Sequence, residues 1–370
     1  MICGDPTRWG LHYFFYMILH LLFVIIGASL LTVVLSDFAV TAFVPTSEGR
    51  VTAWVGNMVY KFMFWLAGKN GHRRLLNYIG LVAILAISIA WILLLWSGFT
   101  LIYLADPNSV LLGTGKTPTD LFEKIYHVGY TLSTLGIGDY VPGNNFWRVF
   151  TSLVSFVGLV TITMSITYLV PVISNAIHKR SLSLRISSFG ETPEEIVINS
   201  YNGTDFSDAE STLNSLSAEI FLYTQNHVAY PILHHMHSNN PTENITLKLA
   251  ALDEALTIFL FHVPAELRPS QLQIQSVRRA ITAYLETVTY LGFTEQPPPR
   301  PRFHLVEEFT GVPLEGTSGP AAEELYAALD KRRRLSYADI RSDGWHWNDM
   351  QGEKYLTDLD MNYSNKQLLS

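Results

Sequence analysis

The sequence predicts an all-α protein with a membrane-embedded first half and a helical soluble second half. Apolar residues make up 48% of the 370 residues and concentrate in the first half. Charge divides at the same place: up to Arg180 there are 11 Lys and Arg against 7 Asp and Glu, and beyond it 14 against 25. The net charge of −7 therefore comes from an acidic second half, which does not favour nucleic acid as a partner. The single cysteine, Cys3, excludes an intrachain disulfide framework.

Three segments are long enough to cross a bilayer, which needs about 20 apolar residues. They are 11–36, 78–104 and 149–177, and none of them contains Asp, Glu, Lys or Arg. The first segment is longer than the core of a secretion signal and its start is not strongly basic, so we treat it as a retained span. The bilayer is thus an expected partner.

A fourth apolar stretch, 51–68, leaves two alternatives. Asn57 and Lys61 are four residues apart and would form the polar stripe of a helix lying in the membrane plane. The alternative is a fourth span with a snorkelling lysine. The choice decides on which side of the membrane the N-terminus lies.

Basic clusters predict the orientation, because Lys and Arg favour the cytoplasmic side. One cluster precedes the second span and the other follows the third: Lys69, His72, Arg73 and Arg74; His178, Lys179, Arg180 and Arg185. We therefore expect a multi-pass protein of the cell membrane. Its segment 105–148 would enter the membrane from outside, and its C-terminal domain would be cytoplasmic. Four domains are predicted. Residues 1–76 form an N-terminal span with an interfacial helix, and residues 77–180 form a central module. Residues 181–296 form a helical domain, and residues 297–370 form a Pro-rich linker with a tail.

The segment 105–148 contains the run T-L-G-I-G-D at 134–139. Two glycines one residue apart let consecutive carbonyls turn toward one axis and replace the water shell of an ion. The preceding residues 120–131 predict a short helix capped by Asp120, with Glu123 in its first turn. The negative end of that helix would point toward the ion path and favour a cation.

Together with Tyr140-Val141-Pro142-Gly143, this run resembles the pore region of two-transmembrane-type and two-pore-domain potassium channels, over 118–177. The resemblance implies a selectivity filter, which we call the filter, made of Thr134, Leu135, Gly136, Ile137, Gly138 and Asp139. It also implies that K⁺ is the permeant ion, with no cofactor. Because the chain has one such segment, it implies a homotetramer that closes one pore.

Three positions depart from the family pattern. Ile137 stands where the family most often has Tyr or Phe, which removes an aromatic side chain that braces the filter, and Ser133 replaces threonine. Tyr130 occupies a position that carries a glutamate, paired with the filter aspartate, in some members. The alternatives are therefore a weakly selective cation channel, or a non-conducting membrane sensor or scaffold. An enzyme is not expected, because no convergent nucleophile, base or metal set is visible.

Two residues of the third span are candidates for bending it during gating. Gly158 lies twenty residues after Gly138, where pore-lining helices commonly carry a hinge, although a close helix contact would also require glycine. Pro171 predicts a second bend near the inner end, where the gate is expected.

The second half predicts a helical bundle followed by a proline-rich linker. Helical spacing of apolar residues covers 207–228, 247–261 and 272–291, and a charged helix covers 321–335. Four histidines near Pro231 leave two alternatives, a metal or pH site and ordinary packing: His227, His234, His235 and His237. No dinucleotide-binding pattern is present, and the regulator of this domain is unknown.

Overall fold

The computed structural model describes residues 6–44, 47–67 and 78–350, excluding the side chains of 6–15, 42 and 235. The first predicted basic cluster, 69–74, and Cys3 lie outside the described residues. The chain divides into two compact units, Met1–Lys61 with Leu81–Pro171, and Phe62–Gly80 with Val172–Ser370. We call them the membrane unit and the C-terminal unit.

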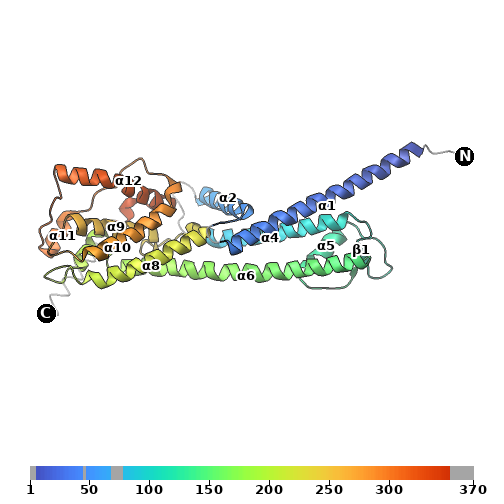
Figure 1. Cartoon of the computed structure of the whole chain (residues 1–370), viewed down its shortest axis with the longest axis horizontal. Helices are drawn as coiled ribbons and strands as arrows, with labels where there is room; N and C mark the ends of the chain where they lie inside the picture. Colours follow the sequence, from blue (N-terminus) through green and yellow to red (C-terminus); the bar gives the residue numbers. More distant parts are fainter. Residues whose placement is uncertain (1–5, 45–46, 68–77, 351–370) are drawn as a thin grey trace. The chain divides into compact units, whose positions relative to one another are not determined.

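The three predicted spans are present as helices (Figure 1), and the third of them continues past Pro171 into the C-terminal unit. These are α1 (Pro6–Phe43), α4 (Ile79–Leu104) and α6 (Asn145–Ser187). Among the described residues, these three helices are long and apolar enough to cross a membrane. The helix α2 (Arg50–Ala67) is not one of them, which agrees with the three-span alternative. The prediction of an all-α membrane protein is confirmed.

Two glycines let α1 and α4 approach closely. A Cβ added at Gly27 would lie 2.7 Å from the carbonyl oxygen of Gly98, and one added at Gly98 would lie 2.9 Å from the side chain of Leu31. Small residues at such a crossing bring helix backbones together in a membrane, where packing rather than the hydrophobic effect drives association. The first span is thus packed against the second.

Asp37 is a buried carboxylate near the end of α1, one residue beyond the span predicted from the sequence. It accepts hydrogen bonds from the backbone N–H of Val51 at 2.7 Å, the Thr52 hydroxyl at 2.8 Å and the Trp91 indole at 2.9 Å. Val51 and Thr52 open α2, so the carboxylate also compensates the positive end of that helix. Asp37 therefore ties α1, α2 and α4 together.

Replacing Asp37 with alanine is expected to lower the free energy of unfolding by about 2–4 kcal/mol, because several buried donors lose their acceptor. Thermal unfolding in detergent measures this change. The matched control is Asp208→Ala, since Asp208 is exposed and its side chain makes no capping hydrogen bond. An Asp37→Ala protein as stable as the control would contradict this role.

The C-terminal unit is a helical bundle, as predicted. Its helices are α7 (Pro193–Asn199), α8 (Ala209–Ala229), α9 (Ile245–Phe261), α10 (Gln271–Thr287), α11 (Phe303–Thr310) and α12 (Pro320–Ser342). Short 3₁₀ turns join or follow them: Pro231–His235, Pro241–Glu243, Thr289–Leu291 and Trp347–Asp349. The helices predicted at 207–228, 247–261, 272–291 and 321–335 correspond to α8, α9, α10 and α12.

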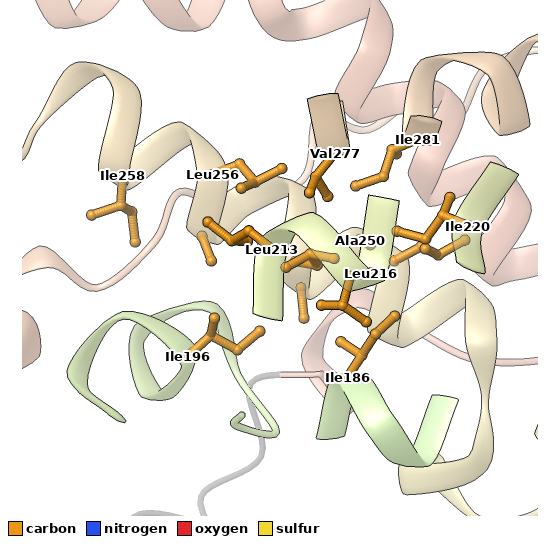
Figure 2. Packing of buried hydrophobic residues seen from close by; sticks show 14 of the residues in the cluster. Ile186, Ile196, Leu213, Leu216, Ile220, Ala250, Leu256, Ile258, Val277 and Ile281 are labelled. Atoms are coloured by element: carbon orange, nitrogen blue, oxygen red, sulfur yellow. The ribbon is translucent and has the colours of Figure 1, made fainter. Parts of the chain in front are cut away.

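The helix α9 lies at the centre of this bundle, and its side chains are buried from Ile245 to Phe259. A helix that is apolar on most sides belongs in a core. Figure 2 shows the surrounding packing, in which Ala250 of α9 lies among Leu213 of α8, Val277 of α10 and Ile186 near the end of α6. The last turns of α6 are therefore part of this core.

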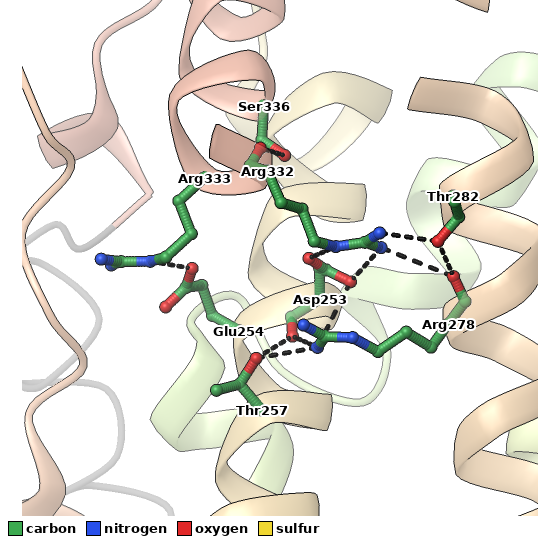
Figure 3. Close-up of polar contacts among 8 residues, drawn as sticks. All are labelled: Asp253, Glu254, Thr257, Arg278, Thr282, Arg332, Arg333 and Ser336. Atoms are coloured by element: carbon green, nitrogen blue, oxygen red, sulfur yellow. Dashed lines mark hydrogen bonds and ion pairs between the residues drawn. The ribbon is translucent and has the colours of Figure 1, made fainter. Parts of the chain in front are cut away.

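Figure 3 shows a buried network that joins α9 to α10 and α12. Both carboxylate oxygens of Asp253 pair with Arg332 at 2.7 Å, Arg278 lies 3.6 Å from Asp253, and Glu254 pairs with Arg333 at 2.7 Å. Burial raises the pKa of the Asp253 carboxyl, but Arg278 and Arg332 outweigh it and the pKa lies below its usual value. The charges compensate one another across three helices.

A second acidic pair lies at the end of α12. Tyr284 donates a hydrogen bond of 2.9 Å to Asp339, while Asp343 is held by His237 at 2.5 Å and by the Asn244 amide at 2.8 Å. Burial opposes ionisation of Asp343, but Lys179 and His237 lower its pKa. Burial and the neighbouring Asp343 raise the pKa of Asp339 to about 7.

Raising the pH is expected to weaken the C-terminal unit through Asp339. The unfolded carboxyl titrates near 3.8 and the folded one near 7. The stabilisation from its protonation is complete below the lower value and is lost as pH rises through the higher one. In thermal unfolding of the full chain at pH values from about 4 to 8, Asp339→Asn should therefore gain stability relative to wild type as pH rises. Parallel pH profiles of the two proteins would contradict this assignment.

Candidate functional site

The predicted capped helix is present as α5 (Leu121–Leu132). Asp120 accepts a hydrogen bond of 2.9 Å from the backbone N–H of Glu123, and the Glu123 carboxylate accepts one of 2.8 Å from the backbone N–H of Asp120. This reciprocal cap satisfies two backbone donors at the start of the helix. The helix ends directly before the filter, so the partial negative charge of its last carbonyls lies next to it.

The filter has an alternating backbone. Thr134, Gly136 and Gly138 have φ values of +59°, +57° and +85°, whereas Leu135 and Ile137 between them do not have positive φ. A Cβ added at either glycine would have no neighbour within 4 Å, so the conformation, and not a lack of space, requires glycine. Such alternation allows successive carbonyls to face one side of the chain.

Thr134 adopts this left-handed conformation without being a glycine, which is uncommon for a β-branched residue. Two backbone hydrogen bonds to the end of α5 hold it there. The N–H of Thr134 donates to the carbonyl of Thr131 at 3.0 Å, and that of Leu135 to the carbonyl of Tyr130 at 2.8 Å. The end of α5 thus fixes the start of the filter.

The other end of the filter is held by a small antiparallel sheet. The strand β1 (Val110–Leu112) pairs with β2 (Tyr140–Pro142), which follows Asp139 directly. The N–H of Gly113 donates to the carbonyl of Asp139 at 2.7 Å, and a Cβ at Gly113 would lie only 2.9 Å from that oxygen. Gly113 therefore permits the close approach of this loop to the filter.

Tyr130 connects α5 to the C-terminal end of the filter. Its hydroxyl donates to the carbonyl of Tyr140 at 2.7 Å and lies 2.7 Å from Nδ1 of the buried His127. The Tyr140 hydroxyl in turn donates to Glu123 at 3.1 Å. In the sequence, Tyr130 stood out only as a departure from the family pattern and Tyr140 only as part of the resembling run, and nothing singled out His127. No spacing rule in the sequence points to these contacts.

Gly158 packs α6 against the end of α5. A Cβ at this position would overlap the carbonyl oxygen of Leu132 and lie 2.8 Å from its carbonyl carbon. Of the two alternatives predicted for Gly158, the structure thus provides the close contact; action as a hinge stays a prediction. Pro171 lies inside α6, and the boundary between the two units falls directly after it.

Among the described side chains, which include three of the four candidate histidines, no group of three or more metal-ligating residues occurs. The rings of His227 and His234 pack edge to face with centroids 5.9 Å apart, and His227 packs on Tyr284. His237 pairs with Asp343 instead. The side chain of His235 lies outside the described residues. A metal or pH role for these histidines stays a prediction.

Three spans, a capped helix and an alternating glycine run define the class of an ion channel. Residues 87–175 match the ion channel family. The matched segment covers α5, the filter and most of α6, and the match favours a non-enzymatic function. Over 328 residues the chain is 34% identical to the uncharacterized membrane protein YdjJ of Bacillus subtilis (strain 168), covering 88% of this chain and 95% of that protein. The chain belongs to the same family as this membrane protein. No solved structure matches it.

Proposed function

We propose that the chain is a potassium-selective channel of the cell membrane. The observation that carries this proposal is the left-handed backbone at Thr134, Gly136 and Gly138. Carbonyls that face one axis can replace the water shell of K⁺ at successive positions. In this proposal the ligands are the carbonyls of Thr134, Leu135, Gly136 and Ile137, together with the Thr134 hydroxyl.

Four copies close the pore in this proposal, because each chain contributes one filter and one capped helix. The exposure of the filter supports assembly: the side chains of Leu135 and Ile137 are 66% and 51% exposed in the single chain. Lipid would cover the remaining apolar side chains of the spans, such as Ile25 of α1 and Leu85 of α4, which are also exposed.

The filter opens to the outside and the C-terminal unit is cytoplasmic in this proposal. The basic residues Lys179, Arg180 and Arg185 in the last turns of α6 support this orientation, because they would favour the inner side of the membrane. Since α6 continues past Pro171 into the core of the C-terminal unit, a change in that unit would reach the proposed gate through one helix.

Ile137 supports a second candidate, a cation channel with weak selectivity. Its aliphatic side chain is half exposed and supplies no ring that could brace the filter from behind. A filter held less firmly would discriminate less sharply between K⁺ and Na⁺. The two candidates share the same ion path and differ in how strongly the filter selects potassium over sodium.

Flux into liposomes tests the proposal. Purified protein is reconstituted with potassium inside, and the outward potassium gradient is used to drive uptake of a tracer cation that permeates potassium channels. We expect uptake that collapses when sodium replaces the internal potassium, and light scattering in detergent that gives a particle of four chains. Absence of flux, or a monomeric particle, would favour a non-conducting membrane sensor or scaffold.

A further inference from the structure

The hydrogen bonds around Tyr130 have only one consistent direction. A phenol carries one hydrogen, and that of Tyr130 is donated to the carbonyl of Tyr140. The contact of 2.7 Å between the Tyr130 hydroxyl and Nδ1 of His127 must then be a hydrogen bond donated by the histidine. His127 therefore carries its hydrogen on Nδ1, and in the neutral ring Nε2 is an acceptor.

That acceptor is buried. The side chain of His127 is 1% exposed, and its Nε2 makes no hydrogen bond in the described structure. The hydroxyl of Thr131, one turn further along α5 and 5% exposed, is likewise without a partner. Both residues line a cavity of about 490 Å³ that also borders Gly136, Gly138 and Ser155 of α6. Polar groups lie in the wall of this cavity, and ordered water there would satisfy both His127 and Thr131.

We propose that His127 and Tyr130 are positioning residues of the filter. The Tyr130 hydroxyl fixes the peptide that follows Asp139, and His127 fixes the direction in which that hydroxyl donates. They take over the role of the aromatic brace that Ile137 cannot fill. This inference rests on the proposed function, since it assigns these residues to the selectivity of the same filter.

Removing the Tyr130 hydroxyl tests the inference. In Tyr130→Phe the Tyr140 carbonyl loses its hydrogen-bond donor. We therefore expect the permeability ratio of potassium to sodium to fall about fivefold or more, because one net hydrogen bond changes an equilibrium constant by about that factor. The matched control is Tyr103→Phe, which removes another buried phenol hydroxyl, bonded to Thr151 at 2.8 Å and not to the filter. The control should lose a similar amount of thermal stability and keep its selectivity.

Two histidine variants decide the matter even where Tyr130→Phe fails to assemble. His127→Asn keeps a donor close to the position of Nδ1 and should retain selectivity, whereas His127→Leu should lower it. Wild-type selectivity in Tyr130→Phe, or in His127→Leu, would overturn the inference while leaving the proposed function intact. A wild-type protein without potassium current would instead overturn the proposed function.

The protonation of His127 can be measured without any current. Nitrogen NMR of histidine-labelled protein, with His127→Asn used for assignment, reports which ring nitrogen carries the hydrogen. We expect the Nδ1–H form. The Nε2–H form would contradict the direction of the hydrogen bonds and so overturn the positioning role of His127.

Discussion

Replacing Gly136 with alanine is expected to abolish potassium flux while the protein stays folded. Gly136 has φ of +57°, a conformation that costs an L-residue about 1–2 kcal/mol. No atom lies within 4 Å of the added Cβ, so the strain is conformational and can be relieved by rotating the peptide. Such a rotation would turn a carbonyl away from the ion path, which the proposed mechanism does not tolerate.

The measurement combines liposome flux with thermal unfolding of the same preparation. Gly311→Ala is the matched control, because Gly311 ends α11 with φ of +68° and also has open space around it. Both variants should lose a similar, small amount of stability, and only Gly136→Ala should lose flux. If Gly136→Ala conducts like wild type, the filter does not carry the ion path.

Replacing Gly158 with valine is expected to cost more stability than any change in the filter. Even the first carbon of the side chain would overlap the carbonyl oxygen of Leu132, which belongs to the backbone and cannot rotate aside. Overpacking of this kind costs about 1–3 kcal/mol or more. Because the contact joins α6 to the end of α5, the displacement would also reach Ser133, the residue directly before the filter.

Thermal unfolding and the yield of assembled protein check this expectation. Gly56→Ala in α2 is the control, since no atom lies within 4 Å of its added Cβ and alanine favours a helix by up to about 1 kcal/mol. The result also separates the two roles of Gly158. If Gly158→Ala keeps full stability and changes only the opening of the channel, Gly158 acts as a hinge and the close contact is unimportant.

Patterns that are local in the sequence predicted much of the fold and of the site. The spans follow from uninterrupted apolar runs, and the cap at Asp120 follows from an acid three residues before Glu123. The filter could be predicted from its two glycines, because few other backbones need two left-handed residues so close together. Each of these signals depends on residues within one segment.

Contacts between distant segments could not be predicted in the same way. Asp37 directly follows the first predicted span, and its partner Trp91 lies 54 residues further along the chain. Arg332 meets Asp253 across 79 residues. The histidines near Pro231 show the same limit, because His237 pairs with Asp343, 106 residues further along the chain, and not with the packed rings of His227 and His234.

The role of Tyr130 could not be predicted from the sequence and became visible only in the fold. In the sequence it marked the absence of a glutamate, and Ile137 marked the absence of a ring. In the structure the Tyr130 hydroxyl reaches the carbonyl of Tyr140, directly after the filter. Side-chain direction on α5 determines this contact, and no spacing rule specifies it.

The most direct test of the central claim is the reversal potential of single channels in a planar bilayer, with potassium on one side and sodium on the other. A potassium-selective filter predicts a reversal potential far from zero and close to the potassium limit, with no such current from Gly136→Ala. A reversal potential near zero would mean that the pore does not select potassium. The absence of any current from assembled protein would contradict the account as a whole.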